Sequence, residues 1–285
     1  MLQRLLNVAM PWRASVPRVS VVRLSGVIAS AGRLSAGLSI ASVGHVLDRA
    51  FSIKPLAAVA LVINSPGGSA AQSHLIFKRI RALADEKKLP VFVFVEDVAA
   101  SGGYMIACAG DEIYADDSSI LGSIGVVSSG FGFTELIGKI GIERRVHTAG
   151  EHKSMLDPFR PEDPKDIVRL EAIQREVHDS FKSLVRERRS TRLKGGDELF
   201  TGEFWAGKQS LALGLIDGIG DIKTILRARF GDKVKLIAIG PDRSFLRRRL
   251  GLDSIGPAVD LILPGLADRG LATLEARSLW SRFGL

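Results

Sequence analysis

The sequence predicts an α/β fold built on a largely parallel sheet. Up to about residue 150, continuous apolar segments of strand length alternate with helical patterns. Strands that are buried on both faces of a parallel sheet have this continuous apolar character, and right-handed crossover helices connect them. The hydrophobic fraction of 46% is ordinary for a folded protein, and 285 residues are enough to bury a sizeable core.

Each expected element follows from its own pattern. The expected strands are short apolar runs over 19–28, 56–64, 89–96, 111–116 and 234–240. The expected helices have helical periodicity or helix-favouring residues and span 34–50, 70–86, 101–109, 132–142, 164–193 and the end of 200–217. Leu75, Ile76, Ile80 and Leu83 should form the buried face of the second helix, and Phe204 and Trp205 should be core residues.

The chain divides into three regions. Residues 1–17 form an N-terminal arm, and residues 18–240 form the main domain. Residues 241–285 change to an Arg-rich stretch followed by apolar residues interrupted by prolines and glycines, so they are interpreted as a C-terminal appendage.

Charge and cysteine content narrow the functional classes. The net charge is +8, but the basic runs lack the interleaved aromatic residues typical of nucleic-acid binding, so nucleic acid is not an expected partner. Cys108 is the sole cysteine and the five histidines show no ligand spacing, so neither metal nor cofactor is expected. Asn7 and Pro11 interrupt the apolar N-terminus. We therefore expect no signal peptide and no transmembrane helix, and a location in the cytoplasm or peripherally on a membrane.

Two strand-to-helix junctions carry the residues that could do chemistry. Gly67 and Gly68 follow the strand over 56–64, and Ser101 follows the strand over 89–96 among very small residues that include Gly102. Glycines let the backbone turn tightly and present N–H groups, and those at Gly68 and near Gly102 are expected to hold an oxyanion, although a plain turn has the same composition. Because parallel strands end at one edge of a sheet, both junctions should lie close together.

A serine nucleophile needs a base, and the candidates in this sequence are the histidines and Lys153. None of the histidines has a convincing acidic partner. Lys153 lies in a glycine-opened loop beside Met155, Leu156 and Phe159. A free lysine titrates near 10.4, and a lysine acting as a base near neutral pH has its pKa lowered by about 3 units, which burial in an apolar pocket produces.

The segments INSPGGSA, VAASGGYMIA, LGSIGV and GEHKSMLDPFRP occur in this order over residues 63–161. Together they resemble the bacterial signal peptide peptidase A (protease IV) family of Ser–Lys serine peptidases. The resemblance extends over residues 18–240 and implies a Clp protease/crotonase-like fold of repeated ββα units. It implies Ser101 as nucleophile, Lys153 as general base, Gly68 with Gly67 in the oxyanion hole, and Ser123 as the residue that orients the lysine.

The chain is similar to the short form of that family, which has one Ser and one Lys per chain. This resemblance implies peptide substrates and a homo-oligomeric ring whose sites are completed between neighbouring subunits. Two other functions stay open: a crotonase-like acyl-CoA hydratase or isomerase, and a non-catalytic scaffold at membranes. A crotonase-like enzyme requires acidic residues at the helix starts, where this sequence has Ser and Gly.

Overall fold

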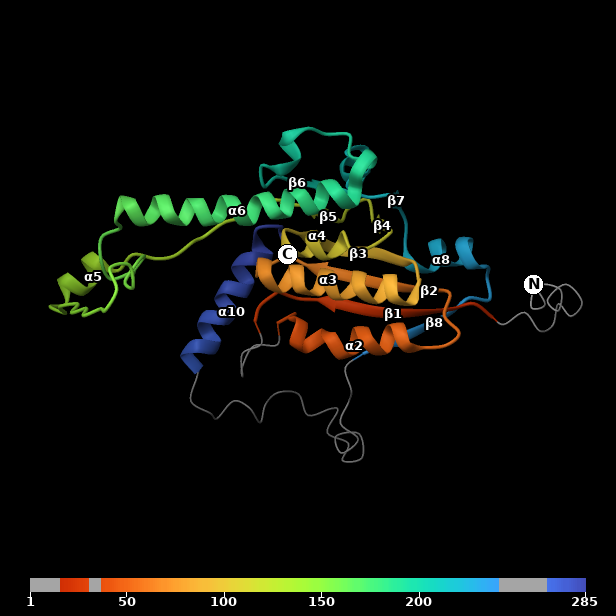
Figure 1. Cartoon of the computed structure of the whole chain (residues 1–285), viewed down its shortest axis with the longest axis horizontal. Coiled ribbons are helices and arrows are strands. Elements are labelled where there is room, and N and C mark those ends of the chain that lie inside the picture. The colour runs from red at the N-terminus through yellow and green to blue at the C-terminus, as the bar shows by residue number, and fades with distance from the viewer. Residues whose placement is uncertain (1–15, 31–36, 241–265) are drawn as a thin grey trace, which may run out of the picture.

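The computed structural model describes residues 16–30, 37–240 and 266–285 (Figure 1). A sheet with helices on both faces forms the body, and the segment between the sheet and the longest helix projects away from it as an arm. We define this arm as residues 126–163 and use the word alone for this segment, as distinct from the N-terminal arm expected over residues 1–17.

An eight-stranded sheet is the centre of the fold. Its strands are β1 (Arg18–Ser25), β2 (Ala58–Ser65), β3 (Val91–Ala100), β4 (Glu112–Ala115), β5 (Ile120–Gly122), β6 (Phe204–Ala206), β7 (Gly218–Ile219) and β8 (Lys235–Ile239). The main path has the order β6-β5-β3-β2-β1-β8, and β4 joins β3 to β7. Every pair is parallel except β5–β6, which confirms the predicted α/β class and the largely parallel sheet.

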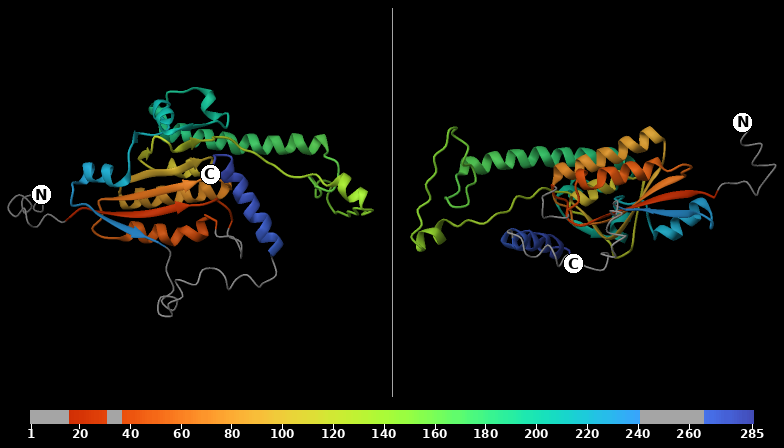
Figure 2. Two further views of the ribbon diagram at one scale, coloured as in Figure 1. Left: turned by 180° about the vertical axis from the view of Figure 1, so that it is seen from behind. Right: turned by 90° about the horizontal axis from the view of Figure 1, so that it is seen from below.

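Helices cover the sheet on both faces. The α-helices of the described residues are α2 (Ile40–Ser52), α3 (Ala70–Lys87), α4 (Gly102–Ala107), α5 (Thr134–Lys139), α6 (Pro164–Arg189), α7 (Gly207–Ala212), α8 (Ile222–Phe230) and α10 (Leu266–Ser281). Of these, α5 lies on the arm and does not cover the sheet. Figure 2 shows α2 and α3 on one side of the sheet and α8 and α10 on the other. The capping box of Ser39 and Ser42 sets the start of α2, and Asp163 with Pro164 sets the start of α6.

The largest apolar core lies between the sheet and α2, α3, α4 and α6. It includes Leu61, Val93 and Ala99 from the strands and Ile76 and Tyr104 from the helices. A smaller core on the opposite face holds Phe92 and Phe94 against α8. The strands thus bury both faces, as their continuous apolar sequences predicted.

The chain's C-terminus covers a further part of the opposite face. Phe283 is buried against Val98 and Ala100 of β3, and Trp280 packs on the same cluster. The Phe283 ring also meets Phe204 edge to face, with 5.1 Å between the ring centroids. The end of the predicted appendage is therefore in contact with the strand that leads to Ser101.

The structure differs from the sequence-based expectations in local detail. The expected helix over 34–50 begins only at Ile40, although residues 31–36 lie outside the described part. Leu75 was expected in the core but is 46% exposed, because it lies on the solvent side of α3. Phe204 is likewise 46% exposed, since it belongs to edge strand β6, whereas Trp205 packs against the main core. Strands β5, β6 and β7 were not predicted because each has only two or three residues.

Candidate active site

The residues singled out in the sequence meet at the carboxyl edge of the sheet. Ser65, the last residue of β2, aligns with Ala99 of β3, and Ala100 aligns with Gly122, the last residue of β5. Ser101 and Ser123 follow these two strands directly. The sheet register therefore brings Gly67, Ser101 and Ser123 to one edge.

Ser101 has a strained backbone at the turn between β3 and α4. Its φ of 51° and ψ of −121° lie in a region that residues with a β-carbon rarely adopt. The Ser101 N–H donates to the carbonyl of Gly122 at 2.8 Å, which holds this turn against β5. The hydroxyl makes no capping hydrogen bond to α4, so an ordinary helix-capping role does not account for this serine. A strained strand-to-helix turn that presents a half-buried serine is typical of a nucleophile.

Gly67 packs directly on this turn. A β-carbon added at Gly67 would stand 2.8 Å from the Cβ of Ser101 and 2.9 Å from the nitrogen of Gly102. Gly67 also has a φ of +99°, so both its conformation and its surroundings require glycine. At Gly102, an added β-carbon would stand 2.2 Å from Oγ of Ser73. The small residues are therefore needed for close packing around Ser101.

The hydrogen bonds of the glycine turn leave one N–H group unused. The Gly67 carbonyl accepts from Ile28 N at 2.8 Å. In a trans peptide the carbonyl and the following N–H point to opposite sides, so the Gly68 N–H points away from Ile28. Within the described residues, neither the Gly68 N–H nor the Gly102 N–H donates to a protein acceptor. Two N–H groups beside a serine, free of protein partners, are what stabilisation of an oxyanion requires.

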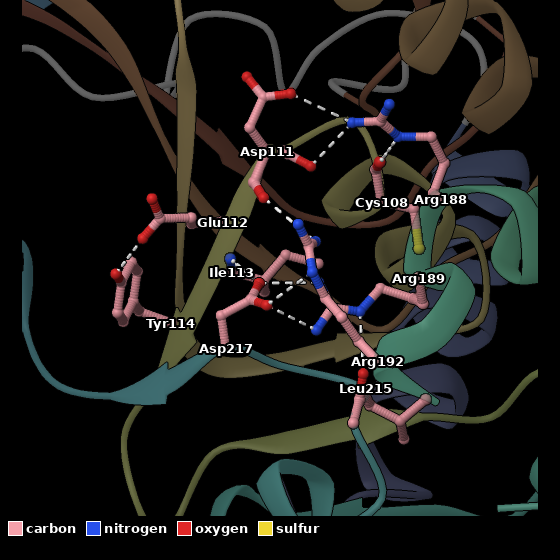
Figure 3. Close-up of polar contacts among 12 residues, drawn as sticks. Cys108, Asp111, Glu112, Ile113, Tyr114, Arg188, Arg189, Arg192, Leu215 and Asp217 are labelled. Atoms are coloured by element: carbon pink, nitrogen blue, oxygen red, sulfur yellow. Dashed lines mark hydrogen bonds and ion pairs between the residues drawn. The ribbon is translucent and has the colours of Figure 1, made fainter. Parts of the chain in front are cut away.

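The opposite end of α4 is held by arginines from other elements (Figure 3). Arg188 of α6 donates to the carbonyls of Cys108 and Gly110 at 2.9 and 3.0 Å. Arg81 of α3 donates to the Ala109 carbonyl at 3.1 Å and pairs with Asp111 at 2.8 Å. These cations satisfy the free carbonyls after the helix, so both ends of the short helix that follows Ser101 are fixed.

A buried ion pair underlies the same helix. The Arg189 side chain is only 1% exposed and binds both carboxylate oxygens of Asp217, at 2.7 and 3.1 Å (Figure 3). Asp217 also accepts from Ile113 N, and Arg189 donates to the Gly214 carbonyl. The pair therefore joins α6 to β4 and to the segment before β7. Because both charged groups are hydrogen-bonded, the cost of burying them is offset.

Two further buried groups, one on α4 and one at its C-cap, are chemically inert. Burial raises the pKa of the Cys108 thiol to about 12 and raises the pKa of Tyr104 well above its usual value. Tyr104 donates its hydroxyl to the Leu215 carbonyl at 2.8 Å. Cys108 is therefore a core residue and not a nucleophile, as its apolar sequence context indicated.

Ser123 lies close to the expected nucleophile. It is 6% exposed, has a φ of 51°, and its N–H donates to the Glu203 carbonyl at 2.6 Å. His178 of α6 holds the next residue, with its Nε2 3.1 Å from the Ile124 carbonyl. This contact could not be predicted from the sequence, because the histidine and the carbonyl are 54 positions apart.

Lys153 is not brought to Ser101 within one chain. Its side chain is exposed in the turn over 151–156, on the arm. Figures 1 and 2 agree that this part of the arm lies beside α5, beyond the body that carries α4. The burial expected for Lys153 is therefore absent in the single chain.

The arm has a structure of its own and an apolar surface. Arg144 pairs with Asp157 at 3.2 Å, and Phe133 packs on Phe159 with 5.6 Å between ring centroids. The backbone hydrogen bond from Phe159 N lowers the pKa of Asp157, and the Arg144 guanidinium acts in the same direction. Several large apolar side chains on the arm and on the first half of α6 are nevertheless exposed: Val127, Phe131, Leu136, Ile140, Ile142, Val168 and Ile173.

The described residues contain no group of three or more His, Cys, Asp or Glu side chains placed to hold a metal ion. Among the helices of residues 16–30, 37–240 and 266–285, none combines the length and the apolar character needed to cross a bilayer.

A largely parallel sheet whose carboxyl edge presents a strained serine beside unbound N–H groups is typical of serine hydrolases and agrees with the Clp protease/crotonase-like fold that the resemblance implies. Residues 83–234 match the model of peptidase family S49, and the chain belongs to this family. Membership identifies it as a serine peptidase and confirms the resemblance to signal peptide peptidase A.

Individual proteins support the family assignment. The chain is 31% identical over 264 residues to the chloroplastic serine protease SPPA of Arabidopsis thaliana, covering 88% of this chain and 39% of that protein. It is 53% identical over 278 residues to a protein of Brucella abortus (strain 2308) named Na(+)/H(+) antiporter NhaA, covering 96% of this chain. The chain spans 38% of the length of that relative.

A solved structure supports the fold. The 1510-N membrane-bound stomatin-specific protease, solved as a mutant, superposes with a TM-score of 0.50 at 17% sequence identity. The superposition covers 80% of this chain and 100% of the solved chain.

Proposed function

We propose that this peptidase cleaves peptides with a dyad of Ser101 and Lys153 through a covalent acyl-enzyme. The observation that carries the proposal is the strained turn of Ser101, beside which the N–H groups of Gly68 and Gly102 have no acceptor among the described residues. Neutral Lys153 takes the hydroxyl proton as Ser101 Oγ attacks the scissile carbonyl. The two N–H groups stabilise the oxyanion, and the protonated lysine then gives its proton to the leaving amine.

Deacylation uses the same groups in a second step. Lys153 takes a proton from water, the resulting hydroxide attacks the acyl carbon, and the Ser101–acyl bond breaks as the proton returns to Oγ. Ser123, buried at the same edge of the sheet, orients the amine by accepting one of its hydrogens. No metal or cofactor takes part in this scheme.

We further propose that the dyad forms between subunits of a homo-oligomeric ring. The projecting position of the arm supports this assembly, because the turn over 151–156, which carries Lys153, lies beyond the body that carries α4 (Figures 1 and 2). The apolar residues of the arm also support it, since side chains such as Phe131 (80% exposed) and Ile140 (62% exposed) would be buried against a neighbour. Burial there would also desolvate the lysine amine and favour its neutral form.

The proposed reaction applies to peptides in general, whereas the proposed natural substrates are a narrower class. Remnant signal peptides are the proposed natural substrates, which would place the enzyme in the cytoplasm or peripherally on a membrane. The name of the Brucella relative describes ion antiport, but the family match over residues 83–234 supports proteolysis as the activity of this chain.

A covalent probe and two variants test the catalytic assignment. A fluorophosphonate should label the wild-type protein at Ser101, as located by mass spectrometry, and should fail to label Ser101→Ala. Ser101→Ala should fold normally and lose peptide cleavage, whereas the scaffold alternative predicts that no serine is labelled. An acyl-CoA hydratase or isomerase would turn over its substrate without labelling.

Sedimentation velocity tests the assembly. The chain has a mass of 30.7 kDa, and the proposal expects a closed species of several times that mass. A stable, fully active monomer would contradict the shared site.

A further inference from the structure

Ser65 connects three segments that meet at the candidate active site. It is the last residue of β2 and is fully buried. Its Oγ donates to the carbonyl of Gly26, just after β1, at 2.7 Å. The same oxygen accepts from the N–H of Gly67 at 3.2 Å. One hydroxyl therefore ties the glycine turn to the neighbouring strand β1.

Ser65 also contacts the helix that follows Ser101. A β-carbon added at Gly103 would stand 2.5 Å from the Ser65 carbonyl oxygen and 3.2 Å from its Cβ. The first turn of α4 thus packs directly on Ser65, and a shift at this residue would be transmitted both to the glycine turn and to the nucleophile's helix.

The hydrogen bond between Gly67 N and the Ser65 hydroxyl belongs to the network that orients the Gly68 N–H. Three hydrogen bonds hold the turn: Gly67 N donates to Ser65 Oγ, Ile28 N donates to the Gly67 carbonyl, and Ser69 N donates to the Ile28 carbonyl. These bonds fix the peptide planes on both sides of Gly67. Glycine would otherwise rotate freely at these positions, because no side chain limits its φ and ψ angles. The Ser65 hydroxyl removes part of that freedom before the substrate arrives.

We propose that Ser65 is a positioning residue, whose hydroxyl holds the Gly67 peptide so that the Gly68 N–H is aimed at the developing oxyanion. This inference rests on the proposed function, in which Gly68 is an oxyanion donor. Ser65 touches neither substrate nor reacting atoms. Its effect is therefore confined to the transition state, because a donor that is misaligned by a fraction of an ångström weakens oxyanion binding and leaves substrate binding intact.

The matched pair for the test is Ser65→Ala and Ser20→Ala. Both serines are fully buried in the same sheet, but Ser20 Oγ has no hydrogen-bond partner in the described structure. We expect Ser65→Ala to lower kcat by roughly tenfold or more, with KM changed less than about twofold. The rate of fluorophosphonate labelling should fall by a similar factor, because Ser101 Oγ displaces fluoride at phosphorus while the phosphoryl oxygen occupies the oxyanion site. Ser20→Ala should retain wild-type values for all three.

A binding measurement separates this role from a structural one. In a Ser101→Ala background, adding Ser65→Ala should leave the Kd of a peptide substrate unchanged. Unfolding by urea should show each variant folded at the assay temperature. A second variant, Ser65→Cys, keeps nearly the same shape with a weaker donor and should give an intermediate kcat.

The outcomes distinguish the two proposals. If Ser101→Ala keeps full activity, the proposed function is wrong. If Ser101→Ala is inactive but folded Ser65→Ala has wild-type kcat, or loses affinity in the binding measurement, the positioning role is wrong. Failure of both Ser65 variants to fold would assign the hydroxyl to the fold alone and would also contradict it.

Discussion

Gly67 lies directly against Ser101, so closely that a β-carbon at Gly67 would stand 2.8 Å from the Cβ of Ser101. The backbone atoms on both sides belong to a strand end and a helix start, so neither can move without disturbing the sheet. Gly67→Ala should therefore displace Ser101 and reduce peptide cleavage at least tenfold.

Gly202→Ala is the control for the backbone conformation. Gly202 has a similar φ of +94°, but a β-carbon there meets nothing within 4 Å of the described structure. Both variants should lose about 1–3 kcal/mol of stability from backbone strain. If the two variants retain equal activity, crowding at Ser101 does not matter to catalysis.

The buried pair of Arg189 and Asp217 should dominate the stability of the α4 region. Arg189→Ala would leave the Asp217 carboxylate with less compensation in an apolar surrounding, and we expect a loss of about 3–5 kcal/mol in the free energy of unfolding. Urea denaturation measures this loss. Lys208→Ala, which breaks the exposed pair with Asp117, should leave the midpoint unchanged. A small effect of Arg189→Ala would show that the pair is replaceable.

Much of the architecture could be predicted from the sequence, because long apolar strands and glycine-rich junctions are local patterns. The strands at 56–64 and 89–96 and the position of Ser101 after them agree with the structure. Short strands such as β6 could not be predicted, because three residues show no periodicity. The hydrogen bond from Arg188 to the Cys108 carbonyl and the ion pair of Arg189 with Asp217 join residues that are distant in sequence, so they could not be predicted. The expected burial of Lys153 is absent in the single chain, because the turn over 151–156 lies on the projecting arm.

The C-terminal aromatic residues should support the strand that carries Ser101. Phe283 is buried against Ala100, the residue before Ser101. Phe283→Ala should cost about 3 kcal/mol of stability and increase hydrogen exchange in β3. Leu285→Ala, at an exposed position of the same terminus, should change neither quantity. Normal exchange in β3 of Phe283→Ala would mean that the C-terminus does not support the site.

Stability should fall under alkaline conditions because of Cys108. Its thiol has a pKa of about 12 in the folded state, against about 8.5 in an unfolded chain. Between these values the unfolded state has lost the proton and the folded state has kept it. The stabilisation is therefore complete below about pH 8.5 and decreases as pH rises, by up to about 1.4 kcal/mol per pH unit.

Cys108→Ala tests this linkage. Urea unfolding at several pH values between about 9 and 11 should give a shallower decline for Cys108→Ala than for the wild type. Iodoacetamide should also fail to alkylate the native thiol at mildly alkaline pH, while alkylating the urea-unfolded chain. Equal slopes for both proteins, or rapid alkylation of the native one, would contradict the buried thiol.

Variants of two residues of the arm, Lys153 and His152, test which side chain is the catalytic base. Lys153→Ala should lower the rate of peptide cleavage by roughly two to four orders of magnitude, and Lys153→Arg nearly as much, since a guanidinium does not deprotonate. The neighbouring His152 is exposed, so His152→Ala should retain substantial activity. A dead but folded His152→Ala, or an active Lys153→Ala, would indicate a different base.

Mixing two inactive variants tests most directly whether the site is shared between subunits. Ser101→Ala and Lys153→Ala are unfolded, mixed in equal amounts and refolded together, with each variant refolded alone as the control. In a ring with random subunit order, about one site in four would combine an intact Ser101 with a neighbour's intact Lys153. The account predicts that the mixture recovers roughly a quarter of wild-type peptide cleavage, while each variant alone stays inactive. A mixed oligomer without recovered activity would contradict a dyad formed between subunits.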